Sequence, residues 1–293
     1  MNKIKDILFK KRHLCKKAII ILLVLCVAFS CFLVYDNLSL DVETIKIESE
    51  KAQALKGFKI AHISDYHNRG SELIDSAVFE SLKAEKPDVI FLTGDLIDKS
   101  RTDIPVSLSF VKAILDLAPV YYVTGNHECN VSIESQSDFD NMISELSDMG
   151  VKVLRQSGEA VSLPNGESVN VYGIDDPYFH CYYSSEITDT TDSLCNELQI
   201  DEDEFNILLA HHPEQLSVYA KYGFDLVFSG HAHGGQGRLF GKGLIAPDQG
   251  FFPEYTSGLY NEGNTKLVLS RGIGNSIIPV RVFNKSHLIF VEF

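Results

Sequence analysis

The sequence reads Asp225-Leu226-Val227-Phe228-Ser229-Gly230-His231-Ala232-His233-Gly234-Gly235-Gln236, an apolar run followed directly by two histidines between glycines. The run predicts a buried strand, and the glycines allow the backbone after it to turn sharply and approach a bound ion or phosphate. If the strand ran straight on, alternate residues would face one side, so both imidazoles would project in the same direction. Taken alone, the pair is as consistent with a structural or exposed role as with metal binding.

Strands and helices alternate upstream of this stretch. Predicted strands cover 42–48, 58–64, 88–93, 120–123 and 205–209, with helices at 71–86, 106–117 and 139–149. This alternation indicates an α/β domain with a sheet covered on both faces, whose functional residues collect at the carboxyl ends of the strands. Further strands are predicted at 266–270, 278–283 and 288–293, a hairpin turn at Pro164-Asn165-Gly166, and an insertion with a short helix at 175–204.

Metal-compatible side chains follow five of these predicted strands. They are Asp65 and His67, Asp95, Asn126 and His127, His211 and His212, and His231 and His233. Carboxylates and imidazoles together suit Mn, Fe or Zn rather than Ca or Mg alone. Two ions about 3.5 to 4 Å apart need a carboxylate that contacts both, and the central Asp95 is the natural bridge. Such a pair generates a metal-activated hydroxide and clamps a phosphoryl group, which suits phosphoester hydrolysis.

Five motifs occur in order between residues 57 and 236. They are Asp65-x-His67, Gly94-Asp95-x-x-Asp98, Gly125-Asn126-His127-Glu128, His211 and Gly230-His231-x-His233. This ordered set resembles the calcineurin-like metallophosphoesterase superfamily. The segments Gly258-Leu259-Tyr260 and 271–276 further resemble its bacterial branch, in which an N-terminal membrane segment carries an external phosphoesterase domain. The resemblance implies an α/β fold built as a mixed β-sandwich flanked by helices, in four α/β/β/α layers, preceded by one transmembrane helix.

The resemblance also implies a role for each motif residue. The first metal would be held by Asp65, His67, Asp95 and His233, and the second by Asp95, Asn126, His211 and His231. His212 remains the alternative to His211. His127 would not be a ligand: it would face the scissile phosphate, as acid for the leaving group or as stabiliser of the transition state, with Asp98 as its orienting partner. Glu128 stands where Asp is frequent in the family.

Charge and hydropathy divide the chain unevenly. Its formal charge is −14, but the seven Lys/Arg and one Asp of residues 1–17 leave 19 basic and 39 acidic side chains for the rest, a net of −20. A domain this acidic repels the phosphate backbone, so nucleic acid is excluded as a favoured partner. The 18 uncharged residues from Ala18 to Tyr35 are just long enough to cross a bilayer core of about 30 Å.

The flanks of this apolar segment predict its orientation. Lysines and an arginine precede it and Asp36 and Asp41 follow it, so the N-terminus is expected in the cytoplasm and the body outside. We therefore expect a basic cytoplasmic tail at 1–17, a signal anchor at 18–35 and an extracytoplasmic domain at 36–293. A cleaved signal peptide is the alternative. Three cysteines lie in the body. Of these, Cys181 and Cys195 could form a disulfide outside the cell.

The predicted function is that of a single-pass cell-membrane enzyme with two divalent or trivalent metal ions, Mn, Fe or Zn. It would hydrolyse phosphodiesters, phosphomonoesters or pyrophosphates at the outer face of the membrane. Its substrate would be a phosphorylated small molecule or a lipid-linked phosphoester. The alternative is a non-catalytic metal-binding scaffold of the same fold, for which loss of His127 or of a ligand would be the signature, and none is missing here.

Overall fold

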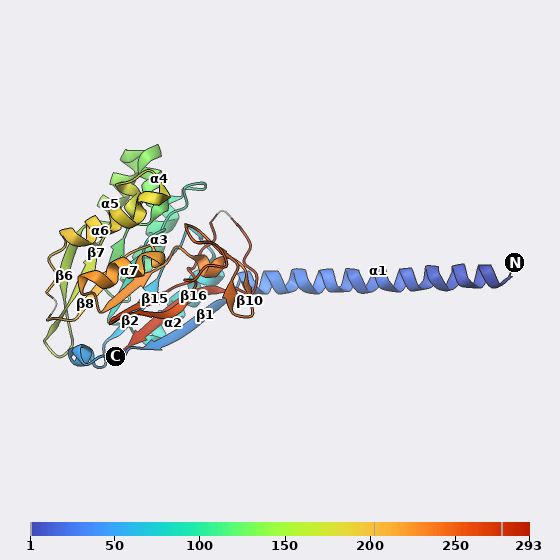
Figure 1. The fold of residues 1–293 in the computed structure, drawn as a ribbon, viewed down its shortest axis with the longest axis horizontal. Helices are drawn as coiled ribbons and strands as arrows, with labels where there is room; N and C mark the ends of the chain where they lie inside the picture. Colours follow the sequence, from blue (N-terminus) through green and yellow to red (C-terminus); the bar gives the residue numbers. More distant parts are fainter. Residues whose placement is uncertain (1, 202, 277) are drawn as a thin grey trace.

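A computed structural model describes residues 2–201, 203–276 and 278–293 of the chain (Figure 1). The helices are α1 (Asn2–Asn37), α2 (Glu72–Glu85), α3 (Ile104–Leu115), α4 (Asn126–Glu134), α5 (Gln136–Asp148), α6 (Ile187–Glu197) and α7 (Leu216–Tyr219), with short 3₁₀ helices η1 (Lys51–Leu55), η2 (Pro177–Phe179), η3 (Ser184–Glu186), η4 (Pro213–Gln215), η5 (Ala220–Tyr222) and η6 (His233–Gly235).

Two six-stranded sheets and two small hairpins make up the strands. The first sheet has the order β1 (Leu40–Lys46), β16 (Ser286–Glu292), β2 (Lys59–Ile63), β3 (Val89–Thr93), β4 (Val120–Val123) and β5 (Lys152–Val153). The second has the order β14 (Gly258–Glu262), β15 (Thr265–Leu269), β9 (Leu226–Ser229), β8 (Asn206–Leu209), β7 (Ser168–Gly173) and β6 (Ser157–Ser162). The hairpins pair β10 (Arg238–Leu239) with β11 (Lys242–Gly243) and β12 (Ile245–Ala246) with β13 (Gly250–Phe251).

Both sheets are mixed, with parallel strands at their centres. Strands β2, β3 and β4 run parallel in the first sheet, and β7, β8 and β9 in the second. Every residue of β3, β8 and β9 is buried, because each of these strands is covered on both faces, and this is why their sequences are almost wholly apolar. The polar residues that follow these strands therefore emerge at the carboxyl edge of each sheet.

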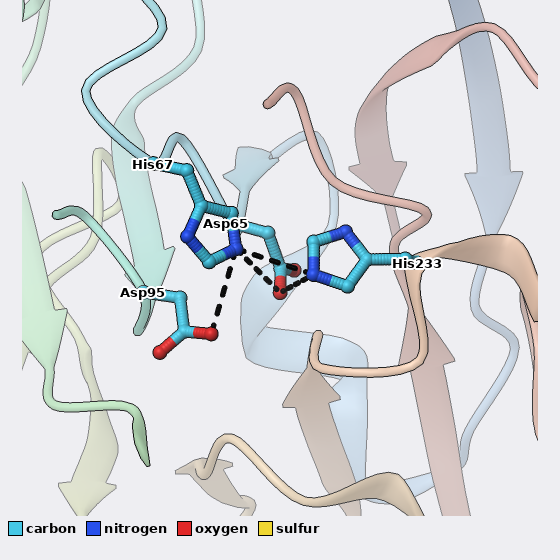
Figure 2. A group of neighbouring side chains, drawn as sticks. All are labelled: Asp65, His67, Asp95 and His233. Atoms are coloured by element: carbon cyan, nitrogen blue, oxygen red, sulfur yellow. Dashed lines mark hydrogen bonds and ion pairs between the residues drawn. The ribbon is translucent and has the colours of Figure 1, made fainter. Parts of the chain in front are cut away.

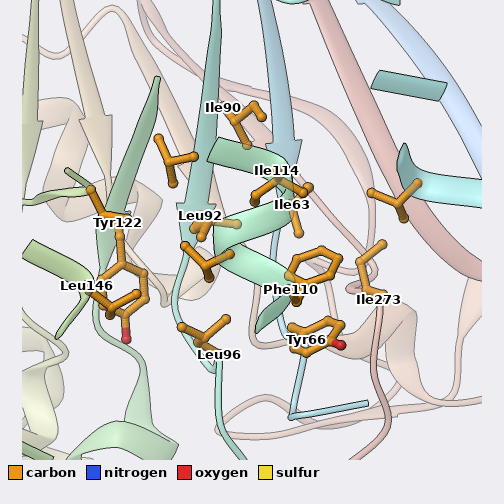
Figure 3. Packing of buried hydrophobic residues seen from close by; sticks show 14 of the residues in the cluster. Ile63, Tyr66, Ile90, Leu92, Leu96, Phe110, Ile114, Tyr122, Leu146 and Ile273 are labelled. Carbon is orange, nitrogen blue, oxygen red and sulfur yellow. The ribbon is translucent and has the colours of Figure 1, made fainter. Parts of the chain in front are cut away.

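Three apolar clusters separate four layers. Side chains of both sheets, such as Phe91 and Phe228, form the cluster between them. Helices α2, α3 and α5 pack on the other face of the first sheet, where Phe110 stacks on Tyr66 (Figure 3). Helices α6 and α7 pack on the other face of the second sheet. The expected α/β/β/α fold, a mixed β-sandwich flanked by helices, is confirmed.

Local sequence explains where the helices begin and end. Helix α3 begins at Ile104, two residues before the predicted start, because the Asp103 side chain accepts a hydrogen bond from the Val106 N–H and Pro105 fits the first turn. Helix α2 ends at Glu85, where Lys86 adopts a left-handed conformation before Pro87. Among the described residues, His13–Asn37 is the one helical stretch long and apolar enough to cross a membrane.

The strand predicted at 278–283 is wrong. Of its described residues, only Val282 pairs, in an isolated parallel bridge with Gly237. The backbone of Arg281 is occupied elsewhere: its N–H donates to Asn37 Oδ1 at 2.8 Å and its carbonyl accepts from Asn37 Nδ2 at 2.8 Å. A residue whose two backbone groups are bound by a side chain cannot join a strand ladder. Helix α4 and strand β14 were not predicted, and all six cysteines are free.

Candidate metal centre

The predicted site residues come together at the carboxyl edge of the two sheets. Five of the seven candidate ligands, Asp65, His67, Asp95, His231 and His233, have φ between 46° and 66°. Residues other than glycine rarely adopt this left-handed conformation, which costs roughly 1–2 kcal/mol per residue. Residues strained in this way are concentrated at functional sites. The imidazoles of the opening motif thus converge through left-handed turns, and not through strand alternation, because β9 already ends at Ser229.

Two glycines are required by the close packing of these turns. Gly94 has φ 83°, and a Cβ there would lie 2.7 Å from His211 Nδ1. A Cβ on Gly230 would overlap the side chains of Ser64 and Asp65. The glycines therefore let the loops after β3 and β9 approach the centre, as the sequence predicted for the second of them.

The first group of ligands is Asp65, His67, Asp95 and His233 (Figure 2). The Nε2 atoms of His67 and His233 lie 3.2 Å apart, and His67 Nε2 lies 3.5 Å from Asp95 Oδ2. His233 Nε2 lies 3.5 Å from Asp65 Oδ1. Ligand atoms bound to one ion at about 2.0–2.2 Å are separated by such distances, so the four side chains fit a single metal ion. All four were predicted to hold the first metal.

A second group adjoins the first through Asp95. It contains Asp95, His211 and His231. His211 Nε2 lies 3.3 Å from Asp95 Oδ2, the same oxygen that faces His67. Asn126 joins the group, because its Oδ1 lies 3.1 Å from His231 Nδ1. One carboxylate oxygen thus faces ligands of both groups, which is the placement that a bridging carboxylate needs.

Protonation in this centre suits metal ligands. Burial lowers the pKa of His67 to about 3 and holds that of His233 well below its usual value, so both rings are neutral at neutral pH. Burial opposes the charging of His211, but the Asp95 carboxylate overrides it and raises the pKa of His211 to about 10. A metal ion between His211 and Asp95 would replace this proton, which is how metal binding couples to proton release.

The two adjacent histidines after β8 differ in their partners. His211 Nδ1 lies 2.7 Å from the Thr93 carbonyl, so Nδ1 carries a proton, and Nε2, which faces Asp95, is the nitrogen that would bind a metal once its own proton is displaced. Among the described residues this buried Nε2 has no hydrogen-bond partner. His212 instead lies between two carboxylates, with Nε2 2.9 Å from Asp176 Oδ2 and Nδ1 2.6 Å from Glu214 Oε1. The geometry favours His211 as the ligand.

His127 lies beside the first group with a fixed tautomer. The Lys99 N–H donates to its Nδ1 at 3.0 Å, so in the neutral ring the proton lies on Nε2. Ser276 Oγ lies 3.2 Å from that Nε2. The expected pairing with Asp98 is not among the hydrogen bonds of the described residues. Asp98 Oδ2 instead lies 3.7 Å from His67 Nδ1, while Oδ1 accepts from the Ser100 N–H.

Glu128 is a buried residue whose role the motif alone did not reveal. Its carboxylate accepts hydrogen bonds from the backbone N–H groups of Gly125 at 2.7 Å, Asp95 at 2.9 Å and Ile97 at 3.1 Å. It therefore ties the loop that carries Asp95 to the start of α4, which carries Asn126 and His127. Burial and the nearby Asp95 carboxylate raise the pKa of Glu128 to about 8, and the backbone donors oppose that shift.

Asp248 was also missed, because it lies in a loop without any motif. Its Oδ2 lies 2.9 Å from His231 Nε2, and its Oδ1 accepts a hydrogen bond from the Tyr178 hydroxyl at 3.0 Å. Nδ1 of His231 points towards Asn126, and Nε2 points towards Asp248. Metal-binding histidines are commonly oriented by a carboxylate at their second nitrogen, and Asp248 occupies that position. Through Tyr178, the 175–204 insertion therefore contacts the residue that faces His231.

Replacing Asp248 by Asn should weaken the second group alone. The neutral amide lacks the anionic charge that raises the basicity of a ligand imidazole, so we expect the affinity for the second ion to fall about 10- to 100-fold. Titration of the metal-free protein with Mn²⁺ measures this change. Glu254→Gln is a control in the same loop region, and equal affinities in both variants would show that Asp248 does not orient His231.

Comparison with known proteins gives one family. A family model described as Calcineurin-like phosphoesterase matches residues 58–235. The uncharacterized metallophosphoesterase YkuE of Bacillus subtilis is 28% identical over 79% of this chain and 77% of its own length. An uncharacterized metallophosphoesterase of Aquifex aeolicus is 30% identical over 86% of this chain and 91% of its own. A dimetal phosphatase from Danio rerio aligns with a TM-score of 0.41 and 15% identity, over 74% of this chain and 88% of that one.

Proposed function

The chain belongs to the calcineurin-like phosphoesterase family, as a metal-dependent phosphoester hydrolase, and from that premise we propose which residues form its active centre. One ion is held by Asp65, His67, Asp95 and His233, and the other by Asp95, Asn126, His211 and His231. The reaction is hydrolysis of a phosphodiester, phosphomonoester or pyrophosphate bond. The ions are Mn, Fe or Zn, because the donor set is imidazole, carboxylate and amide oxygen without thiolate.

One observation carries this proposal: a single oxygen of Asp95 faces both groups. Asp95 Oδ2 lies 3.5 Å from His67 Nε2 and 3.3 Å from His211 Nε2. Burial alone would favour the neutral acid, but His211, His127 and His67 hold the pKa of Asp95 well below its usual range, so the bridge is anionic. A buried anion between two sets of imidazoles is the electrostatic requirement of a site for two cations.

The chain's own residues then act on the substrate around these ions. When bound, the ion pair supplies an activated water and neutralises charge on the phosphoryl oxygens. His127 keeps Nδ1 as the acceptor of the Lys99 N–H, so its Nε2–H points away as a donor for a phosphoryl or leaving-group oxygen. Ser276 lies at this Nε2 and marks where that oxygen would approach. Glu128 and Asp248 hold the loops and the His231 ring in position.

We further propose that α1 is an uncleaved anchor that holds the domain at the outer face of the cell membrane. The candidate span His13–Asn37 continues without a break to the domain, and basic residues precede it. A phosphorylated small molecule or a lipid-linked phosphoester would reach the centre from that side. Asp98, beside His67, is kept as a positioning residue of this site.

The proposal is tested with the full chain in lipid nanodiscs. Mono-, di- and pyrophosphate esters, both soluble and lipid-linked, are offered before and after metal removal with a chelator. At least one class of ester should be hydrolysed, with turnover lost on chelation and restored by Mn²⁺, Fe²⁺ or Zn²⁺. If the metal-loaded chain turns over none of them, the non-catalytic scaffold becomes the better account.

A further inference from the structure

Four phenylalanines project from the surface beside the anchor helix. Phe240, Phe251, Phe252 and Phe283 have exposed fractions of 96%, 77%, 79% and 58%, and we call them the phenylalanine rim. Scattered exposed apolar residues are common on proteins. A group of large aromatic side chains on neighbouring loops is different, because such a patch usually marks a surface that is covered by a partner or by lipid.

Backbone contacts gather the rim into one place. The Arg238 N–H donates to the Val282 carbonyl at 2.9 Å, which sets the β10–β11 hairpin, with Phe240 at its turn, beside the 281–283 segment. The Phe252 N–H donates to the Leu244 carbonyl at 2.9 Å and so brings the β12–β13 hairpin alongside. In Figure 1 the hairpin labelled β10 lies next to the end of α1 that joins the domain.

The end of the anchor helix is fixed to the same segment. The Phe283 ring lies 4.7 Å from the ring of Phe32, centroid to centroid. Asn37 binds both backbone groups of Arg281, and the Asn284 N–H donates to Asp36 Oδ2 at 2.9 Å. Phe32 lies three residues before the end of the apolar span, so Phe283 is held about one helical turn inside the depth that the anchor spans.

The backbone at three rim residues adopts a conformation that is unfavourable for phenylalanine. Phe240, Phe252 and Phe283 have φ of 51°, 54° and 54°, in the left-handed region. Glycine and asparagine are the residues that normally occupy such turns, and bulky side chains there are outliers. The exposed rings of Phe240 and Phe252 are therefore kept at a cost to the backbone, which is expected where a side chain acts outside the domain.

We propose that the phenylalanine rim inserts into the lipid bilayer that α1 crosses. The proposal rests on the anchoring proposed above. In this arrangement the domain does not rotate freely about its anchor but contacts the membrane through the 238–252 and 281–283 segments. Lys285 suits this placement, because its ammonium lies 4.9 Å from the Tyr35 ring at the end of the span, where aromatic and basic residues meet lipid headgroups.

This placement brings the metal centre to the lipid surface. Arg281, whose backbone is bound by Asn37 of the anchor, lies with Nη2 3.4 Å from Nδ1 of the candidate ligand His233. Asp248, beside His231, belongs to the same 238–252 segment as three of the four rim residues. A phosphoester at headgroup depth would therefore reach the centre without leaving the membrane.

The absence of tryptophan from the chain makes a direct test possible. Single variants Phe240→Trp, Phe252→Trp and Phe283→Trp of the full chain are placed in nanodiscs of phosphatidylethanolamine and phosphatidylglycerol with brominated acyl chains, which quench tryptophan. Val24→Trp, inside the span, is the control for insertion of the anchor. Tyr182→Trp, at a position that is 91% exposed in the segment before α6, is the control for a water-exposed position.

The rim variants should show blue-shifted emission and lose fluorescence in brominated discs as Val24→Trp does, while Tyr182→Trp does not. If Val24→Trp is quenched and the rim variants behave as Tyr182→Trp does, the rim proposal is wrong and the anchor stands. If Val24→Trp is not quenched, the anchor is wrong and the rim proposal falls with it. A blue shift without quenching, present only with two chains per disc, would assign the rim to a second copy. Metal content equal to wild type verifies folding of each variant.

Discussion

The Asp95→Asn protein is expected to lose bound metal and turnover together. Asparagine can still accept the backbone N–H of His127, which Asp95 Oδ1 accepts at 2.8 Å, so the loop should keep its path. It cannot present a second anionic oxygen to His67 and His211 at once. Without that bridge the cations face only imidazoles, an amide and Asp65, and we expect turnover to fall at least about 10²-fold, the scale of losing one electrostatic stabiliser.

Elemental analysis and an aryl phosphodiester assay measure the two effects on the same sample. Asp116→Asn, the same substitution at an exposed position at the end of α3, is the matched control and should bind metal and turn over as wild type does. Retention of two metals per chain by the Asp95→Asn protein would remove Asp95 as the bridge. An unchanged circular dichroism spectrum separates metal loss from unfolding.

His127→Ala should have the opposite signature, with metal retained and turnover lost. His127 contributes a proton donor at Nε2 and no ligand to either group, so its removal should cut turnover of an aryl phosphodiester by at least about 10²-fold, the usual scale for general acid catalysis. The loss should be larger for an alkyl ester, because an alkoxide leaving group needs the proton more than a nitrophenolate does.

The choice of esters separates the two roles considered for His127. Equal losses for alkyl and aryl esters would indicate stabilisation of phosphoryl charge in place of protonation of the leaving group. His180→Ala, at an exposed position of the 175–204 insertion, is the control and should leave both activities unchanged. Near-normal turnover of both esters by the His127→Ala protein would take His127 out of the mechanism.

Much of the fold could be predicted because its strands are short apolar runs that end in polar motifs. β3 and β9 are buried on both faces, and so Asp95, His231 and His233 follow runs that are easily recognised. The carboxyl ends of parallel strands meet at one edge of a sheet. For this reason the sequence alone predicts that the ligands lie close together. The strand predicted at 278–283 failed, because the Asn37 side chain takes the backbone groups of Arg281.

The residues that hold the metal ligands in position could not be predicted, because they act through tertiary contacts that leave no local sequence pattern. Asp248 lies in a loop 17 residues after His231, and only folding brings its carboxylate to the imidazole. The left-handed turns at the candidate ligands are only weakly indicated by the sequence, because aspartate and histidine are enriched in this conformation but also occur in every other kind of loop. The preference for His211 over His212 likewise depends on Thr93, Asp176 and Glu214.

We infer that one dinuclear centre, bridged by Asp95, performs phosphoester hydrolysis. It is tested most directly by titrating the metal-stripped full chain with Mn²⁺ while turnover of an aryl phosphodiester is followed against metal bound per chain. Turnover should rise until two ions are bound per chain and then level off. Full turnover at one ion per chain, or no turnover with two ions bound, would contradict it.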